Sequence, residues 1–362
     1  MASRHRRTDN IRSIDSGNTV LQVMKHGLLA FFVALLVTLL IGKWQISRYL
    51  DTALALENPP MTIIVPAGTS ITVEAKALAD QGLIKWPRVL TTYARFTGQT
   101  SIKAGEYQLN DGVTPRELIG LWVKGAVVQY SLTIPEGLRF RDWIKLLAQT
   151  PKVTPVLQGQ GMDELLLELE LDVEHLEGWF FPDTYSYVAG DTDRDILLRA
   201  HTRMREVLDE EWQNRAENLP YASPYEALIM ASIIEKETGV AEERGQIAGV
   251  FVRRLQKGMR LQTDPTVIYG LGDAYKGNIK RRHLREPGAY NTYLIDGLPP
   301  TPIAMPGREA IHAALHPESS DSLYFVAKGD GSHYFSATLA EHQQAVREYQ
   351  LKRRENYRSS PQ

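Results

Sequence analysis

The chain has 362 residues, of which 43% are hydrophobic and 23% charged, an ordinary globular composition with room for about two domains. Its formal net charge is −2 and no long run of one sign occurs, which argues against a nucleic-acid-binding protein. It contains no cysteine, so disulfide frameworks and thiolate zinc sites are excluded.

The N-terminal part predicts a membrane anchor. The first 26 residues are polar and basic, and an unbroken run of apolar and small residues follows from Gly27 to Gly42. Lys43 and Trp44 border this run, and both residue types favour the membrane surface. A removed signal peptide is the alternative, but no cleavage site lies close to the run. The positive-inside rule places the N-terminus in the cytoplasm and the rest of the chain across the inner membrane.

A strand-turn-helix pattern then occurs twice. Residues 62–79 and 131–148 each contain a β-rich run, a Pro-x-Gly turn and an amphipathic helix. We expect a small α+β region over residues 61–155, joined to the anchor by a tether over residues 45–60. Such units resemble LysM-like modules, and their role is either glycan binding or spacing of a later domain from the membrane.

The next segments combine helical patterns with an aromatic cluster. Residues 156–173 are rich in Leu and Glu at helical spacing, and Asp193–Leu208 predicts another amphipathic helix. Between them, EGWFFPDTY at Glu177–Tyr185 gathers four aromatic rings. These rings either hold sugars, with Glu177 or Asp183 bonding ring hydroxyls, or belong to the hydrophobic core.

The most informative stretch begins with a complete helix start. Ser223 can act as N-cap, Pro224 suits the first helical position, and Glu226 completes a capping box. Ala227–Ile234 are then apolar on every side except for one serine. This pattern indicates a helix buried in the core of a domain.

Two carboxylates follow in the last turn of this helix, before Gly239. Glu237 stacks over Ile233 and Ile234, and the helix C-terminus adds partial negative charge. Both effects disfavour the ionised form, so the pKa of Glu237 should rise until the group holds a proton near neutral pH, as a general acid requires. Glu235 lies over a smaller, more polar patch and can pair with an arginine. Alternatively, both are ordinary residues at a solvated helix end.

Further polar residues follow a helix predicted over Glu242–Lys257. Asp264 precedes a proline, which predicts that it caps the next helix, whereas Gln262 and Thr263 are better placed to meet a ligand. The sequence YNTY at 290–293 is a polar aromatic patch, and the prolines beyond it stiffen a loop.

The C-terminal part predicts a hairpin over Leu323–Ser336 and a capping box at Thr338–Glu341 that starts the last helix. Of the nine histidines, only His312 and His316 have i,i+4 spacing, and no HExxH motif or sequence-clustered carboxylate accompanies them. We expect neither a metal site nor a cofactor.

Five motifs resemble, in order, those of the MltG/YceG-like endolytic murein transglycosylase family. They are EGWFFPDTY, ASIIEKET, GMRLQTDPTVIYG, YNTYLIDGLPPTPIAMPG and LYFVAKGDGSHYFS, and the resemblance covers roughly Pro60 to Tyr349. It implies a LysM-like region followed by an α+β catalytic domain, and it matches the family's catalytic acid to Glu237.

The predicted fold class is therefore α+β, with a transmembrane helix, a small LysM-like α+β region, and an α+β catalytic domain in which a buried helix bears the catalytic glutamate. The expected division is a cytoplasmic tail (1–26), a transmembrane helix (27–44), a tether (45–60), a LysM-like region (61–155), a catalytic domain (156–352) and a C-terminal tail (353–362).

The resemblance implies a membrane-anchored enzyme that cuts the MurNAc-GlcNAc bond of nascent peptidoglycan strands, forms 1,6-anhydro ends and terminates elongation. Its expected partners are glycan strands, the inner membrane and the cell-wall synthesis machinery. Two rivals remain: a non-catalytic glycan-binding or division scaffold, and a peptidoglycan hydrolase that uses Asp264 or Asp183 as a base. The candidate substrate-binding residues are Glu177, Gln262, Thr263, Asp264, Tyr290, Asn291 and Tyr293.

Overall fold

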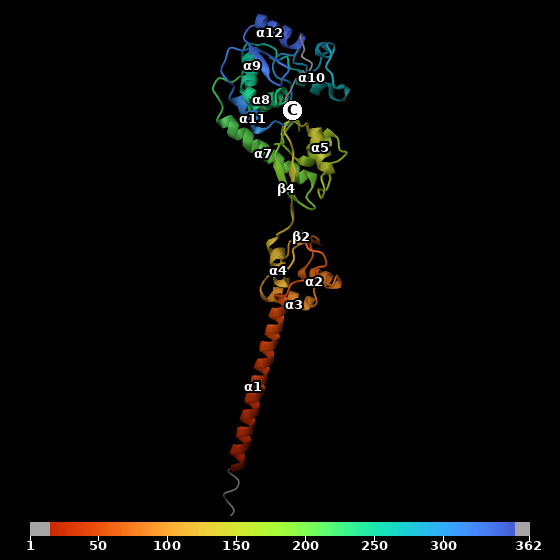
Figure 1. Cartoon of the computed structure of the whole chain (residues 1–362), viewed down its shortest axis with the longest axis vertical. Coiled ribbons are helices and arrows are strands. Elements are labelled where there is room, and N and C mark those ends of the chain that lie inside the picture. The colour runs from red at the N-terminus through yellow and green to blue at the C-terminus, as the bar shows by residue number, and fades with distance from the viewer. Residues whose placement is uncertain (1–14, 352–362) are drawn as a thin grey trace, which may run out of the picture. The chain divides into compact units, whose positions relative to one another are not determined.

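The computed structural model describes residues 15–351, and the chain divides into two compact units between Val128 and Gln129 (Figure 1). The predicted C-terminal tail, 353–362, and residues 1–14 of the predicted cytoplasmic tail lie outside the described residues.

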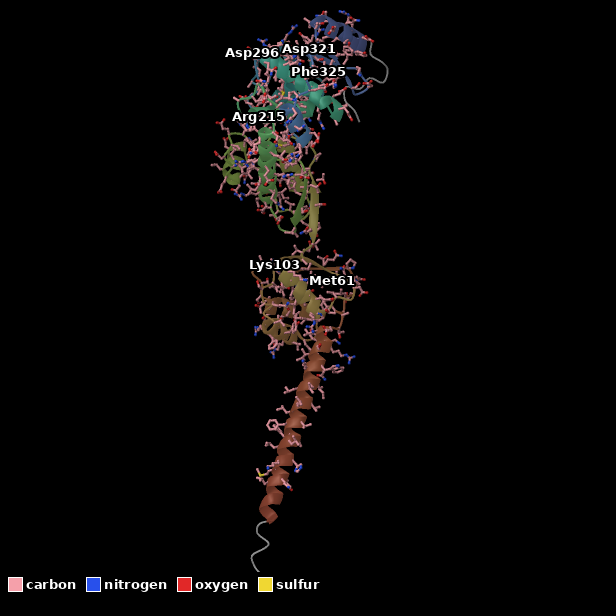
Figure 2. All side chains as sticks on the ribbon, turned by 90° about the vertical axis from the view of Figure 1, so that its left-hand side faces the viewer. Met61, Lys103, Arg215, Asp296, Asp321 and Phe325 are labelled. Carbon is pink, nitrogen blue, oxygen red and sulfur yellow. The ribbon has the colours of Figure 1, made fainter. Side chains whose placement is uncertain are left out.

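The first unit begins with helix α1, Asp15–Leu50, the long red helix in Figure 1. Its stretch Leu21–Leu50 is long and apolar enough to cross a membrane, and the side chains of its most apolar window are not buried (Figure 2). Thirty residues rise about 45 Å, against about 30 Å for a bilayer core. A helix suited to a membrane anchor is thus present, and it extends beyond the predicted span, 27–44.

A small α+β body completes the first unit. Its strands pair antiparallel, with Met61 opposite Leu109, and its core contains Tyr107, Trp122 and Leu50 from the last turn of α1. The anchor helix therefore continues into the core of this body. The elements are β1 (Met61–Val65), α2 (Ile71–Asp80), α3 (Pro87–Phe96), β2 (Gly105–Leu109) and α4 (Pro115–Lys124).

The second unit starts with a subdomain built around the core residues Phe140, Trp143 and Phe180. Strand β3 pairs antiparallel with β4, and this pairing makes the second strand-turn-helix copy part of the second unit. The region predicted over 61–155 is thus divided between the two units. The elements of the subdomain are β3 (Gln129–Thr133), α5 (Phe140–Gln149), α6 (Met162–Leu169) and β4 (Thr184–Val188).

The remainder of the second unit is a helical assembly with one β-hairpin. Helix α8 lies at its centre and packs against α7, α9, α10 and α11. The elements are α7 (Asp193–Gln213), α8 (Pro224–Glu237), η1 (Ala241–Glu243), α9 (Arg244–Gln256), α10 (Asp264–Leu271), η2 (Gly272–Ala274), η3 (His283–Arg285), α11 (Arg308–Leu315), β5 (Tyr324–Ala327), β6 (His333–Ser336), α12 (Leu339–Val346) and the π-helical turn η4 (Arg347–Leu351).

Helix α8 forms as predicted, with one difference at its start. Ser223 is the N-cap and accepts the amide of Glu226, but the Glu226 carboxylate bonds the amide of Ala222, 2.6 Å away, one residue outside a capping box. All residues of Ala227–Ile234 are buried. The one serine among them, Ser232, donates to a carbonyl within the helix and accepts the amide of Ile303 at 2.9 Å, so its hydroxyl is satisfied in the core.

One predicted helix is shorter than expected, whereas the predicted hairpin and the last capping box are confirmed. The helix expected over residues 156–173 is limited to α6, because Gly159 adopts a positive φ before it and Glu170 a left-handed conformation after it. The hairpin β5–β6 and the capping box at Thr338 are present as expected.

Candidate active site

The candidate acid, Glu237, is the last residue of α8. Its Oε1 accepts a hydrogen bond from the hydroxyl of Thr263, while Oε2 makes no hydrogen bond to any described residue. Burial raises the pKa of Glu237 to about 7, the hydroxyl of Thr263 opposes this rise, and the charge of Asp264 adds to it. The group is therefore a carboxyl that can carry a proton at neutral pH and has one oxygen available to a ligand.

The segment 262–264 is held against Glu237 by a turn in a left-handed conformation. Gln262 has φ +53°, and its amide donates to the carbonyl of Thr292, 3.1 Å away. The amide of Thr263 donates to the hydroxyl of Thr292, also at 3.1 Å. Arg254 is buried behind the turn and donates to the carbonyl of Leu261 at 2.8 Å. Three chain segments thus fix the position of the threonine that contacts the candidate acid.

Asp264 does not cap helix α10, contrary to the prediction. The residue at the N-cap position is Thr263, no side chain caps the helix, and the carboxylate of Asp264 instead accepts the hydroxyl of Tyr293 at 2.7 Å. Pro265 explains why capping is dispensable, because a proline at this position has no amide hydrogen to satisfy. Burial raises the pKa of Tyr293, and the charge of Asp264 adds to this effect, so the phenol stays a donor.

Asn291 holds the neighbouring loop rather than an open site. Its side chain is buried and donates to the carbonyl groups of His283 (3.2 Å) and Glu286 (2.8 Å), and it accepts the amide of Tyr293 at 3.1 Å. The neighbouring Thr292, which we did not single out from the sequence, is buried and links the loop to Thr263. Its only sequence signal is its place between the two candidates.

Glu177 and Tyr290 belong to a second polar cluster, and no hydrogen bond between described residues joins either to Glu237. The carboxylate of Glu177 accepts the amide of Phe140 at 2.9 Å and the hydroxyl of Tyr269 at 3.0 Å. Burial raises its pKa to about 7. The ring of Tyr290 lies 4.9 Å from that of Tyr269. Glu177 thus joins α5 to α10, and Tyr290 packs the loop that follows α10 against that helix.

The turn of the second strand-turn-helix copy lies beside the end of α8, a feature that sequence reasoning missed. Lys236 donates from Nζ to the carbonyl of Gly137, 3.0 Å away. Glu235 accepts the amide of Gly307 at 3.2 Å, and its pKa is raised by burial and by the charge of Glu136. The second copy therefore contacts the last turn of α8, which also bears the candidate acid.

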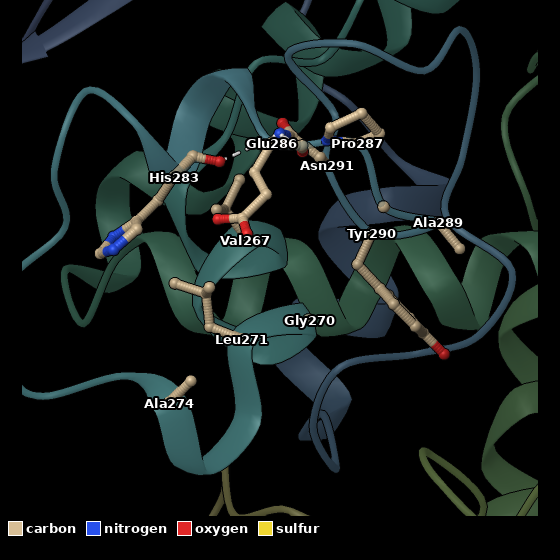
Figure 3. Close-up of a pocket in the computed structure, with 11 residues that line it drawn as sticks. Val267, Gly270, Leu271, Ala274, His283, Glu286, Pro287, Ala289, Tyr290 and Asn291 are labelled. Atoms are coloured by element: carbon tan, nitrogen blue, oxygen red, sulfur yellow. Dashed lines mark hydrogen bonds between the residues drawn. The ribbon is translucent and has the colours of Figure 1, made fainter.

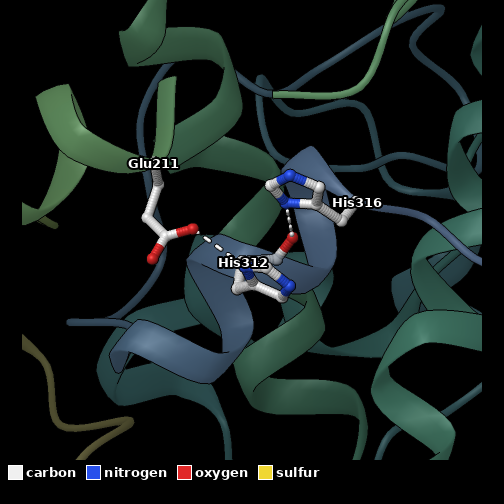
Figure 4. Close-up of side chains that lie close together, drawn as sticks. All are labelled: Glu211, His312 and His316. Atoms are coloured by element: carbon white, nitrogen blue, oxygen red, sulfur yellow. Dashed lines mark hydrogen bonds and ion pairs between the residues drawn. The ribbon is translucent and has the colours of Figure 1, made fainter. Parts of the chain in front are cut away.

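A group of potential metal ligands lies elsewhere, where α7 and α11 meet (Figure 4). The carboxylate of Glu211 lies 2.8 Å from Nδ1 of His312, so a carboxylate that the sequence did not reveal does accompany the histidine pair. Glu211 also pairs with Arg308 at 2.8 Å, and both ring nitrogens of His316 face main-chain carbonyls. The ligand atoms of this group are thus engaged in bonds that join the two helices.

The comparisons with known proteins agree with the motifs. The model of the YceG-like family matches residues 63–348. The endolytic murein transglycosylase of Bacillus subtilis (strain 168) is 31% identical, with coverage of 80% of this chain and 84% of that protein. The endolytic murein transglycosylase of Streptococcus pneumoniae serotype 2 is 29% identical, and the match covers 88% of this chain but 65% of that longer protein.

A crystal structure of a YceG-like protein from Listeria monocytogenes is 32% identical and aligns with a TM-score of 0.48, over 78% of this chain and 98% of that one. The family model covers the residues in which the five motifs and the candidate acid lie. This chain belongs to the YceG-like family.

Proposed function

We propose that this chain is an endolytic murein transglycosylase in which Glu237 acts first as general acid and then as general base. One observation carries the proposal: a carboxyl group with a pKa raised to about 7 ends a helix whose residues 227–234 are all buried, in a chain whose curated relatives bear that enzyme's name. Such a group is matched to proton transfer at neutral pH. A scaffold protein has no use for it.

The reaction would proceed in two proton transfers. Glu237 protonates the oxygen that leaves the muramyl residue, and the bond to C1 breaks through an oxocarbenium-like state. The ionised Glu237 then takes the proton of the muramyl 6-hydroxyl, whose oxygen attacks C1 and closes a 1,6-anhydro ring. Glu237 is protonated again at the end, no water is consumed, and no second catalytic carboxylate is required.

The neighbours of Glu237 would support both steps. Thr263 donates to Oε1 and so fixes the carboxyl group, while Oε2 accepts no hydrogen bond from a described residue and is the oxygen for the substrate. Asp264 keeps the pKa of Glu237 high, and Tyr293 holds Asp264 in place. Gln262, Tyr290 and Asn291 would shape the sugar site, and Glu177 would act on it only through Tyr269.

A hydrolase is the second candidate, because Asp264 is close enough for its charge to raise the pKa of Glu237. Asp264 would then activate a water molecule. Asp183, the other base considered, bonds the amide of Thr184 at 2.7 Å and forms no hydrogen bond with Glu237, Thr263 or Asp264 in the described structure, so it is the weaker choice.

We further propose that the N-terminus is cytoplasmic and that both units lie on the outer side of the inner membrane. There the enzyme would meet nascent strands beside the synthesis machinery, and a cut would terminate elongation. The α+β body of the first unit would serve as a LysM-like module that binds glycan or acts as a spacer.

Product analysis on purified glycan strands tests the proposal. Transglycosylation should leave anhydromuramyl ends, about 18 Da lighter than the reducing ends of hydrolysis by stoichiometry. Long anhydro-terminated fragments should appear before any disaccharide. Reducing ends carrying solvent oxygen-18 would identify a hydrolase, anhydro-disaccharide alone would contradict endolytic cutting, and the absence of any cleavage would favour a scaffold.

A further inference from the structure

A strongly basic loop follows α10. Residues 276–285, here called the basic loop, contain five Lys or Arg residues and no acidic residue, within a chain of net charge −2. All five are exposed. In the part of the chain that is described, the side chains of Lys280, Arg281 and Arg285 form no ion pair and no hydrogen bond; the main-chain amide of Lys280 donates to His283. Uncompensated charges of one sign at an exposed loop favour an anionic ligand.

A pocket of about 320 Å³ lies between α10 and residues 283–291, the segment in which the basic loop ends (Figure 3). Val267 and Leu271 supply its apolar side, and Glu286 extends over Val267 from the opposite loop. The carboxylate of Glu286 makes no ion pair or hydrogen bond with any described side chain. The pocket therefore has one unpaired acid over an apolar surface. Of the basic loop only His283 lines it, and Arg285 directly precedes Glu286 in the chain.

This pocket is connected to the candidate active site through a single helix. Asp264, Val267 and Leu271 share one face of α10, so the pocket begins about 4.5 Å and ends about 10 Å along the helix from Asp264. On the other side, Tyr290 and Asn291 line the pocket just before Tyr293, which bonds Asp264. A substituent on a sugar bound at Glu237 would reach the pocket with two or three extended residues, at about 3.5 Å each.

We propose that the basic loop and Glu286 bind the peptide that substitutes the murein strand, with the peptide carboxylates on Lys280, Arg281 and Arg285 and the side-chain amine of its diamino acid on Glu286. The inference rests on the proposed function and names the substrate as peptide-bearing strands. The charge pattern matches such a peptide, because an anionic surface alone would leave Glu286 unused. Val267 and Leu271 would receive the methylene groups of the amine-bearing side chain.

The test compares full-length protein in detergent on two substrates: glycan strands that retain their peptides, and the same strands stripped by an amidase. The wild type should cut peptide-bearing strands faster. The variant Lys280→Gln/Arg281→Gln/Arg285→Gln should lower the ratio of the two rates by roughly tenfold, as expected for three exposed ion pairs. The control Arg205→Gln/Lys257→Gln/Lys328→Gln removes the same charge elsewhere and should keep the wild-type ratio.

A second experiment tests the contribution of Glu286 separately from that of the cations. Acetylation of the peptide amines and the substitution Glu286→Gln should each lower the rate on peptide-bearing strands, and together they should add nothing further. A fully additive loss would place the amine elsewhere and overturn the assignment of Glu286.

Three outcomes separate this inference from the proposed function. If wild type cuts neither substrate, the proposed function fails. If it cuts both at equal rates, or the loop variant leaves the ratio unchanged, only the peptide site fails. If the loop variant loses rate only in vesicles that contain anionic phospholipid, the loop binds the membrane surface and the peptide assignment is overturned.

Discussion

At the scale of single residues, the site distinguishes two carboxylates that are two positions apart on one helix. Burial raises the pKa of both Glu235 and Glu237. Glu235, however, accepts a main-chain amide and is near Arg244 and Lys236, whose charges oppose the rise. Among the described residues, no cation contributes to the pKa of Glu237. Glu237 therefore lacks both the main-chain donor and the nearby cations that favour the ionised form of Glu235.

The first prediction follows from this difference. Glu237→Gln keeps the size of the side chain but cannot transfer a proton, so kcat should fall by at least about 100-fold. The carboxyl of Glu237 ionises near pH 7 in the folded protein and near 4.5 in the unfolded chain. The free energy of unfolding therefore falls as pH rises from about 4.5 to about 7, and a neutral amide avoids this loss. At pH 7.5 the Tm should therefore equal or exceed that of wild type.

Fragment release from murein and thermal melts measure both effects. Glu235→Gln is the matched control and should retain most of the activity, because its carboxylate bonds the main chain rather than facing a ligand. A dead Glu235→Gln beside an active Glu237→Gln would reverse the assignment of the acid.

The second prediction concerns pH. The acid must be protonated, so kcat/KM should fall as pH rises above about 7, the pKa of Glu237. The charge of Asp264 raises this pKa, and therefore Asp264→Asn should move the falling limb to lower pH. The hydrogen bond from Thr263 lowers it, and therefore Thr263→Val should move the limb to higher pH. pH profiles of the three proteins measure the limbs, and shifts in the same direction would exclude Glu237 as their origin.

Sequence reasoning at the residue scale succeeded where the cause was local. Glu237 was predicted to hold a proton because its helix could be located from Ser223 and Pro224, and its pKa is indeed raised by burial. The prediction that Asp264 caps α10 was wrong, because Asp followed by Pro resembles a helix cap in any sequence. Only the fold shows that Tyr293, 29 residues away along the chain, takes the carboxylate instead.

At the scale of elements, two of the five family motifs, EGWFFPDTY and the proline-rich YNTYLIDGLPPTPIAMPG, lie in close contact beside α8. Gly178 has φ +86°, and a Cβ on it would overlap the ring of Pro302, while Leu228 of α8 lies beside the same position. The glycine thus meets two requirements, a left-handed backbone and contact with a rigid loop. A side chain here would separate the aromatic motif from the proline-rich loop that covers α8.

Gly178→Ala should accordingly destabilise the second unit and reduce activity. Gly190→Ala is the matched control, because Gly190 has φ +98° but a methyl group added there would have no other atom within 4 Å. Overpacking costs about 1–3 kcal/mol, so denaturant melts should place Gly178→Ala about 2 kcal/mol below Gly190→Ala. Equal stabilities would show that the two motifs are not held by close contact.

Element boundaries were predictable where the local sequence signals agreed, as for α8 and the hairpin β5–β6. The contact of the second strand-turn-helix copy with α8 was not. The sequence presented two similar copies at a fixed offset, but β1 pairs with β2 inside the first unit and β3 pairs with β4 inside the second. Strand partners far apart along the chain are set by tertiary packing, which the repeat pattern does not encode.

At the scale of the whole molecule, the membrane topology can be tested directly. With a cytoplasmic N-terminus and α1 as anchor, a reporter that is active only outside the cytoplasm should be active when fused after Gln362, and the protein should stay in the membrane fraction. The same reporter fused before α1 should be inactive. A soluble mature form that begins near Leu56 would show a cleaved signal peptide instead.

The last prediction separates the two units. Deleting residues 51–128 should leave the second unit folded, because its two hydrophobic cores contain no buried residue before Ile134. A deletion of residues 61–150, the whole region over which the two copies recur, should unfold it, because Phe140, Trp143 and Leu147 would be lost from a buried core. Losing one buried aromatic side chain costs about 3–5 kcal/mol, and typical domain stability is about 5–15 kcal/mol.

Thermal melts of the two deletion proteins measure this contrast, and equal folding of both would contradict the division at Val128. The folded 51–128 deletion then reports on the first unit itself. If that unit binds glycan, affinity for polymeric strands should fall while the rate on short soluble strands is retained. Unchanged affinity would make the unit a spacer, which its direct continuation from α1 through the buried Leu50 also suits, because the helix then fixes the body close to the membrane.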